Sequence, residues 1–177
     1  MTLSNGVIVG ALAVVNAAGS VVSPTTGLPW FHEGIDLRRP SAAERQALVD
    51  ATTPPSAPVN TTIGVVATSA ALSKAECRKM ASVAHDGLAR AIRPVHSMFD
   101  GDTIFALSTG AGELPEPELP EHLRGRARGV ALNAVLEAAA DCFAAACTIG
   151  VIDAVSGGAA LAYRDLCPSA FGRRRAT

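Results

Sequence analysis

Three short runs of β-branched and small apolar residues are spaced along this chain, and each precedes a segment with the pattern of a helix. The runs cover residues 7–16, 61–69 and 103–108. They are apolar at consecutive positions, which is typical of strands that are covered on both faces. The order strand, helix, strand, helix, strand, helix predicts an α+β fold with helices layered on sheet, rather than a helical bundle.

The helices have recognisable start signals. Ser41 with Glu44, and Ser73 with Glu76, have the spacing of a capping box, in which two side chains bind the free amides of the first helical turn. They predict one helix ending near residue 51 and a second ending near Arg93. A third, long and largely buried helix is expected over residues 124–154.

Composition limits the classes of protein. The 177 residues fit one domain, and 15 Lys and Arg residues against 16 Asp and Glu residues give no basic surface for nucleic acid. The apolar stretch 130–155 is interrupted by Asn133, Glu137, Asp141 and Asp153, so we expect no membrane span. No signal peptide is recognised, and the four cysteines have no paired spacing. We therefore expect a cytoplasmic protein with reduced thiols.

A proline-broken linker, residues 52–60, ends in the tripeptide Asn60-Thr61-Thr62. Cleavage after Asn60 would give Thr61 a free α-amino group, whose pKa of roughly 7.7 to 8.0 suits a base for its own hydroxyl. Thr61 would then be an N-terminal nucleophile. Taken alone, the same residues are equally the end of a loop followed by two β-branched residues that start a strand.

Several blocks of sequence carry a more specific signal because they occur together in one order. They are VGALAVVNAAG (9–19), TGLPW (26–30), NTTIGVVAT (60–68), AHDGLAR (84–90), DGDTIFALSTG (100–110) and YRD (163–165). Together they resemble the C-terminal half of the self-cleaving aminopeptidase family. That family includes the L-aminopeptidase/D-esterase/amidase enzymes, the β-peptidyl aminopeptidases and the nylon-oligomer hydrolases.

The resemblance implies a fold and a reaction. The fold is a helix/sheet/sheet/helix sandwich of the N-terminal-nucleophile-hydrolase type, incomplete in this chain. The reaction is hydrolysis of small peptides or amides with a free amino group, after self-cleavage between Asn60 and Thr61. Thr61 matches the family's nucleophile. Asn16 matches the asparagine whose amide faces the oxyanion, a role typically worth a few kcal/mol.

Asp100 and Asp102 match two acidic positions near the nucleophile. Alternate residues of an extended segment project to the same side, so one carboxylate could bind Thr61 and the other orient the first. Two such acids would raise each other's pKa. Asp-Gly-Asp lacks the further ligands of a calcium loop, and we expect neither metal nor cofactor.

Family members also have a long preceding segment that supplies a catalytic lysine, an oxyanion donor and much of the substrate pocket. These features are not found in this chain, and Lys74 and Lys79, on a predicted solvated helix face, do not replace that lysine. Three hypotheses follow: a threonine-nucleophile hydrolase, an inactive or complementing subunit of one, and an acyltransferase with the same nucleophile. We expect a homo-oligomer or assembly with a complementing N-terminal segment.

Overall fold

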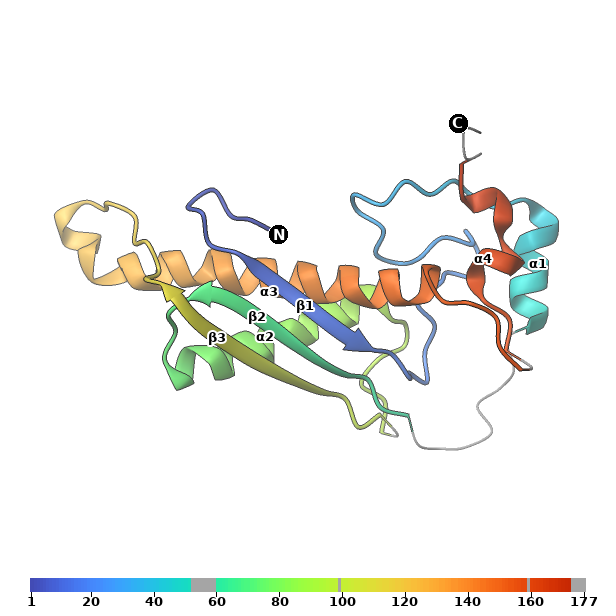
Figure 1. The fold of residues 1–177 in the computed structure, drawn as a ribbon, viewed down its shortest axis with the longest axis horizontal. Helices are drawn as coiled ribbons and strands as arrows, with labels where there is room; N and C mark the ends of the chain where they lie inside the picture. Colours follow the sequence, from blue (N-terminus) through green and yellow to red (C-terminus); the bar gives the residue numbers. More distant parts are fainter. Residues whose placement is uncertain (52–59, 99, 159, 173–177) are drawn as a thin grey trace.

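The computed structural model describes residues 1–51, 60–98, 100–158 and 160–172, and its described strands form one three-stranded sheet. The strands are β1 (Val9–Val14), β2 (Ile63–Ala70) and β3 (Thr103–Gly112). The central strand β2 is antiparallel to β1 and parallel to β3 (Figure 1). The mixed α+β class predicted from the sequence is confirmed.

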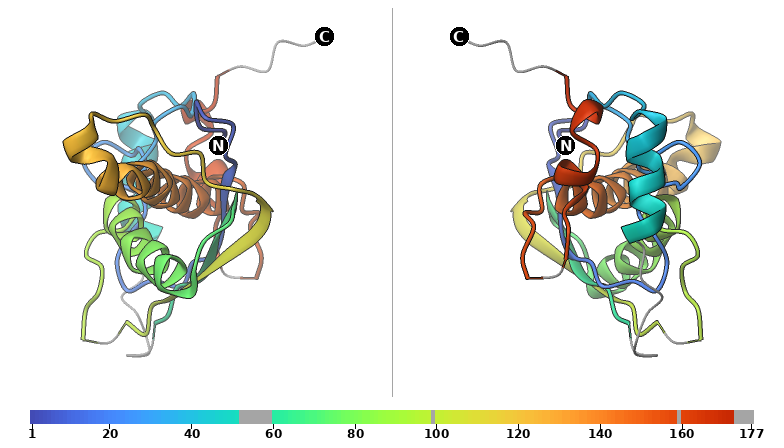
Figure 2. Two further views of the ribbon diagram at one scale, coloured as in Figure 1. Left: turned by 90° about the vertical axis from the view of Figure 1, so that its left-hand side faces the viewer. Right: turned by 90° about the vertical axis from the view of Figure 1, so that its right-hand side faces the viewer.

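Helices α2 (Lys74–Ala91) and α3 (Ala127–Ile152) cover one face of the sheet (Figure 2). Helix α2 is the crossover that two parallel strands require between them. The core between the layers is fully buried and includes Val66, Met80 and Phe143. Close approach depends on glycine, because a Cβ at Gly87 would lie 2.0 Å from the Ala140 carbonyl oxygen of α3.

The opposite face of the sheet is uncovered by the described residues. Leu12 of β1 pairs with Val65 of β2, which pairs with Phe105 of β3, so the three side chains form a row. Leu12 is 67% exposed and Phe105 is 62% exposed. The strands are apolar on both faces as predicted, but only one face has a covering layer here. The second sheet of the expected sandwich stays a prediction.

The remaining elements are α1 (Ala42–Ala51), η1 (Glu121–Arg126), α4 (Tyr163–Leu166) and η2 (Pro168–Ala170). Both predicted capping boxes form, at the starts of α1 and α2. The long helix was expected to begin at 124, but a 3-10 turn comes first and α3 begins at Ala127. All four cysteines are free thiols, as predicted. Most of the proline linker, residues 52–59, lies outside the described residues.

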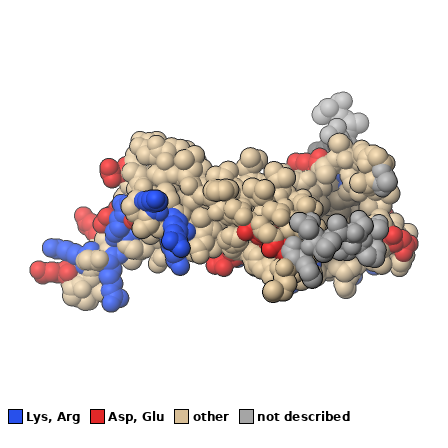
Figure 3. Space-filling view, turned by 90° about the horizontal axis from the view of Figure 1, so that it is seen from below, with Lys and Arg blue, Asp and Glu red and all other residues tan. Residues whose placement is uncertain are grey.

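The stretch 121–152 is long and apolar enough to cross a membrane by length and composition alone. However, 56% of its most apolar window is buried inside the protein, which is how the core helix of a layered fold looks. Charged side chains gather at the end of the molecule where α2 and η1 begin, whereas the middle of the surface in Figure 3 is largely uncharged. Arg128 of α3 binds Glu76 of α2 at that charged end, 2.8 Å between Nε and Oε1.

Candidate functional site

Three strand ends meet at one edge of the sheet (Figure 1). Because β1 is antiparallel to its neighbour, its C-terminal end lies beside the starts of β2 and β3. The Thr61 amide donates to the Asn16 carbonyl oxygen at 2.8 Å. On the other side, Asn60 forms a parallel bridge with Asp100. The pairing of the strands thus brings all four predicted catalytic residues, Asn16, Thr61, Asp100 and Asp102, to this edge.

Gly101 lies close to both groups of the predicted self-cleavage reaction. Its amide donates to the carbonyl oxygen of Asn60 at 2.8 Å. A Cβ at Gly101 would lie only 2.9 Å from Oγ1 of Thr61, so the hydroxyl rests where a larger residue would put its side chain. The carbonyl predicted to be attacked is therefore polarised by an N–H donor, next to the hydroxyl predicted to attack it.

Asp100 is bound by main-chain amides. Its Oδ1 accepts from Ala18 at 3.3 Å and its Oδ2 from Ser97 at 2.8 Å. Burial acts to raise the pKa of Asp100, but the bonds from Ser97 and Ala18 and the charge of His96 outweigh it, so the pKa is lowered. The expectation that the paired acids raise each other's pKa is therefore wrong for Asp100, because amide donors stabilise its carboxylate.

The second acid, Asp102, has a side chain that is 4% exposed. Its Oδ1 accepts from the Thr62 amide at 2.9 Å, and its Oδ2 lies 3.1 Å from Nδ1 of His96. Burial, with the nearby charge of Asp102, raises the pKa of the Cys147 thiol to about 12. The thiol is therefore protonated at neutral pH. In the described structure Asp102 binds the residue after Thr61, rather than Thr61 itself.

Two residues of this edge, Gly101 and His96, were not singled out from the sequence. The signal for Gly101 was its place between Asp100 and Asp102, where a residue without a side chain lets neighbouring groups come close to the main chain. His96 lies two residues after Pro94 in a connecting segment. No helical or strand periodicity there predicts where its side chain points. Its ring lies 5.2 Å from that of His85, whose pKa is lowered by burial and by the neighbouring imidazole.

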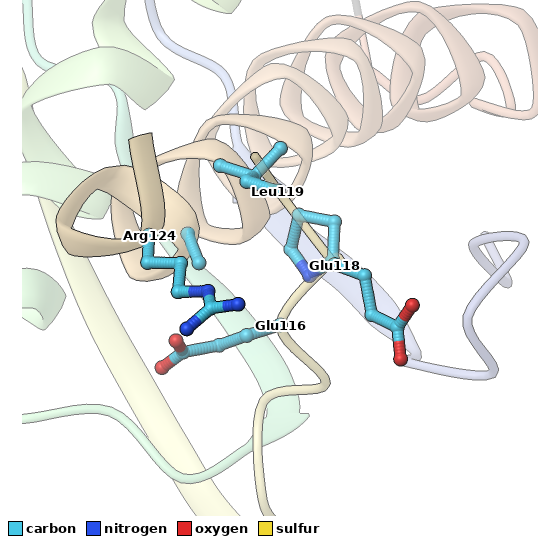
Figure 4. A pocket seen from close by; sticks show the side chains of 6 residues that line it. Glu116, Glu118, Leu119 and Arg124 are labelled. Carbon is cyan, nitrogen blue, oxygen red and sulfur yellow. The ribbon is translucent and has the colours of Figure 1, made fainter. Parts of the chain in front are cut away.

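Among residues 1–51, 60–98, 100–158 and 160–172, no group of three or more His, Cys, Asp or Glu side chains is placed to hold a metal ion. A surface hollow lies elsewhere, between residues 116–119 of the loop after β3 and the side chains of Arg124 and Ala127. There Arg124 points toward Glu116, while Glu118 points away (Figure 4). This hollow lies near the C-terminal end of β3, whereas Thr61 precedes the start of β2 at the opposite end of the sheet, so it does not surround the candidate nucleophile (Figure 1).

Comparison with known proteins assigns the chain to a family of peptidases. The model of Peptidase family S58 matches residues 1–160, and the chain belongs to that family. This agrees with the resemblance drawn from the sequence blocks.

The relatives that the chain matches include aminopeptidases and 6-aminohexanoate-oligomer endohydrolases. An uncharacterized aminopeptidase of Mycobacterium tuberculosis is 51% identical over 97% of this chain and 51% of its own length. One from Mycobacterium leprae is 45% identical over 97% of this chain and 48% of its own length. A 6-aminohexanoate-oligomer endohydrolase of a Kocuria species is 34% identical over 73% of this chain and 40% of its own length. The chain thus spans about half the length of the curated aminopeptidase relatives that it matches.

Proposed function

We propose that this chain is a threonine-nucleophile amide hydrolase that first cleaves its own peptide bond between Asn60 and Thr61. The observation that carries the proposal is the contact between the Gly101 amide and the Asn60 carbonyl oxygen, beside a Thr61 hydroxyl that lies 2.9 Å from where a Cβ of Gly101 would stand. Family membership supports a hydrolase of peptides or amides, and the contact supports Thr61 as its nucleophile.

The proposed self-cleavage has two chemical steps. Oγ1 of Thr61 attacks the carbonyl carbon of Asn60, the C–N bond breaks, and the hydroxyl proton passes to the released amine. Water then hydrolyses the ester, leaving Asn60 with a carboxylate and Thr61 with a free amine and hydroxyl. The Gly101 N–H already donates to the carbonyl oxygen on which negative charge develops.

After cleavage the Thr61 amine lies beside two carboxylates. Asp100 and Asp102 give this edge negative charge that suits an ammonium group, either that of Thr61 or that of a substrate. We therefore propose small peptides or amides with a free amino group as substrates. Oligomers of 6-aminohexanoate, named for the Kocuria relative, have such an end and belong in the test panel beside aminoacyl anilides.

The experiment is intact-mass analysis of the full-length chain during incubation after purification. We expect two pieces of 60 and 117 residues. N-terminal sequencing of the larger piece should give Thr-Thr-Ile as its first residues. Thr61→Val keeps the β-branched shape and removes the hydroxyl, so it should stay intact. Thr61→Ser keeps a hydroxyl and should still be cut. A processed Thr61→Val chain would exclude this nucleophile.

A second candidate is favoured by the uncovered sheet face. The exposed row that includes Leu12 and Phe105 is an apolar surface of a kind that soluble chains rarely leave open. We propose that a complementing segment or another copy of the chain covers it, which would make the chain one subunit of an assembled enzyme. A chain that stays intact alone, yet is cut when co-expressed with the preceding half of a family member, would favour this candidate over independent activity.

A further inference from the structure

The ring of His96 contacts Asp102, and Asp102 binds the backbone next to the candidate nucleophile. Nδ1 of His96 lies 3.1 Å from Oδ2, while Oδ1 accepts from the Thr62 amide at 2.9 Å. A carboxylate offers only acceptors, so the ring nitrogen is the donor in this pair. One carboxylate therefore links a loop histidine to β2 at the residue after Thr61.

The part of this link next to β2 is buried. The Asp102 side chain is 4% exposed, and Thr62 is fully buried. A buried carboxylate oxygen needs a hydrogen-bond partner, and here the His96 ring, itself 41% exposed, supplies it. If the imidazole is removed, Oδ2 loses its donor and the carboxyl group is free to rotate. The bond from Oδ1 to Thr62 then weakens as well.

The backbone of His96 is in a sparsely populated conformation, with φ at 55°. Residues other than glycine adopt this left-handed region at a cost, and histidine and asparagine are among the types that enter it most readily. The loop accepts that cost where the imidazole reaches Asp102. The other charged or titratable groups that act on this ring or on its neighbour are His85, Asp86 and Asp100.

We propose that His96 is a positioning residue, which holds the Asp102 carboxylate so that it fixes the Thr62 amide and thereby keeps Thr61 against Gly101. This inference rests on the proposed role of Thr61 as nucleophile. His96 touches neither the hydroxyl nor the scissile carbonyl in the described structure, so it acts through Asp102.

The test measures amide hydrogen exchange of Thr62 by NMR in the full chain carrying Thr61→Val, which the proposed reaction cannot cut. His96→Gly removes the donor and tolerates the left-handed backbone. His96→Asn also tolerates that backbone and places an amide N–H near the position of Nδ1. We expect Thr62 to exchange about tenfold faster with His96→Gly, the effect of losing one such hydrogen bond, and near the parent rate with His96→Asn.

Val66, in the middle of β2, is the internal reference, and its exchange should not change. His85→Asn is the matched control, because it removes the neighbouring imidazole without touching Asp102. If His96→Gly does not fold, His96→Asp against His96→Asn is the second comparison: the two side chains have the same shape, and only Asn donates. The faster exchange is then expected in the Asp variant.

The proposal is overturned if Thr62 exchange is unchanged without the donor, if His96→Asn exchanges as fast as the donor-free variant, or if Val66 accelerates equally. In the last case His96 stabilises the whole fold. Because the parent chain is uncleavable, none of these results depends on processing. A Thr61 chain that never cuts itself would sink the proposed function and leave the His96 measurement valid.

Discussion

The amide nitrogen of Thr61 lies 2.8 Å from the main-chain carbonyl oxygen of Asn16. This bond holds the end of β1 to the start of β2 at the predicted nucleophile. Because it uses the main chain of Asn16, the side-chain amide of this exposed residue is left for another role. Mutation of the Asn16 side chain therefore tests its predicted oxyanion role and leaves the main-chain bond to Thr61 in place.

Asn16→Ala should slow self-cleavage by roughly 10²–10³-fold, the usual effect of losing one oxyanion donor. The free energy of unfolding should change by less than about 0.5 kcal/mol, because the main-chain bond remains and the side chain is exposed. A time course of intact mass and a urea titration measure the two effects. Asn133→Ala, an exposed position on α3, is the control. Processing at the parent rate would remove Asn16 from the oxyanion site.

Gly101→Ala should slow self-cleavage by about tenfold or more, because the new methyl group would lie 2.9 Å from Oγ1 of Thr61 and must displace the hydroxyl. Gly112→Ala, at the end of β3, is the control, since a Cβ there meets no atom within 4 Å. The measurement is again the rate at which the intact chain disappears. Equal rates for the two variants would mean that the contact with Gly101 is not used in the reaction.

Sequence reasoning succeeded where the signal is local. The Ser73 and Glu76 pair lies within one turn, so the spacing alone predicted the capping box that the structure contains. Strands were predicted from runs of apolar residues, within a few residues of their observed ends. Thr61 and Asp100 were placed near each other only through a family resemblance, because no local pattern shows that the strands they precede are neighbours.

Other features depend on which elements pack together. Arg128 binds Glu76 across 52 positions of sequence, and no spacing rule connects them. His96 reaches Asp102 because the loop between α2 and β3 folds back at a left-handed residue. The uncovered sheet face could not be predicted from the sequence either, since Phe105 lies in a strand that is apolar on both faces. Its pattern predicts a covering layer without saying which chain supplies it.

Gly87→Ala should destabilise the protein by about 1–3 kcal/mol. Its Cβ would lie 2.0 Å from the Ala140 carbonyl oxygen, so α2 and α3 must move apart. Gly129→Ala should instead stabilise by about 0.5–1 kcal/mol, because that exposed helical position is open and alanine is the better helix former. Urea unfolding measures both. Equal effects in the two helices would contradict close contact at Gly87.

Stability should fall in acid through Glu76. The hydrogen bond from the Arg128 guanidinium, with the Ser73 amide, lowers the pKa of Glu76 from 4.5 to about 2. A lowered pKa stabilises the fold above the unfolded-state value, so this contribution is complete above about pH 5 and is lost as the pH falls from about 4.5 toward 2. The pair is partly exposed, which limits its effect to about 1 kcal/mol.

Glu76→Gln should therefore flatten the dependence of the unfolding free energy on pH in this window. Thermal or urea unfolding at pH 6, 4 and 3 measures it. Glu137→Gln, on the exposed side of α3, is the control and should leave the slope unchanged. A parent slope that persists in Glu76→Gln would assign the acid sensitivity to other carboxylates.

The uncovered face of the sheet should accept a charged residue. Phe105, near the start of β3, is 62% exposed, and lysine at that position can extend into water. Phe105→Lys should therefore change the unfolding free energy by less than about 0.5 kcal/mol, while it reduces self-association in sedimentation velocity. Thr109→Lys, exposed on the same strand and polar already, is the control. Unfolding of Phe105→Lys would mean that the face is covered within the chain itself, whereas unchanged association would place the contact between copies on another surface.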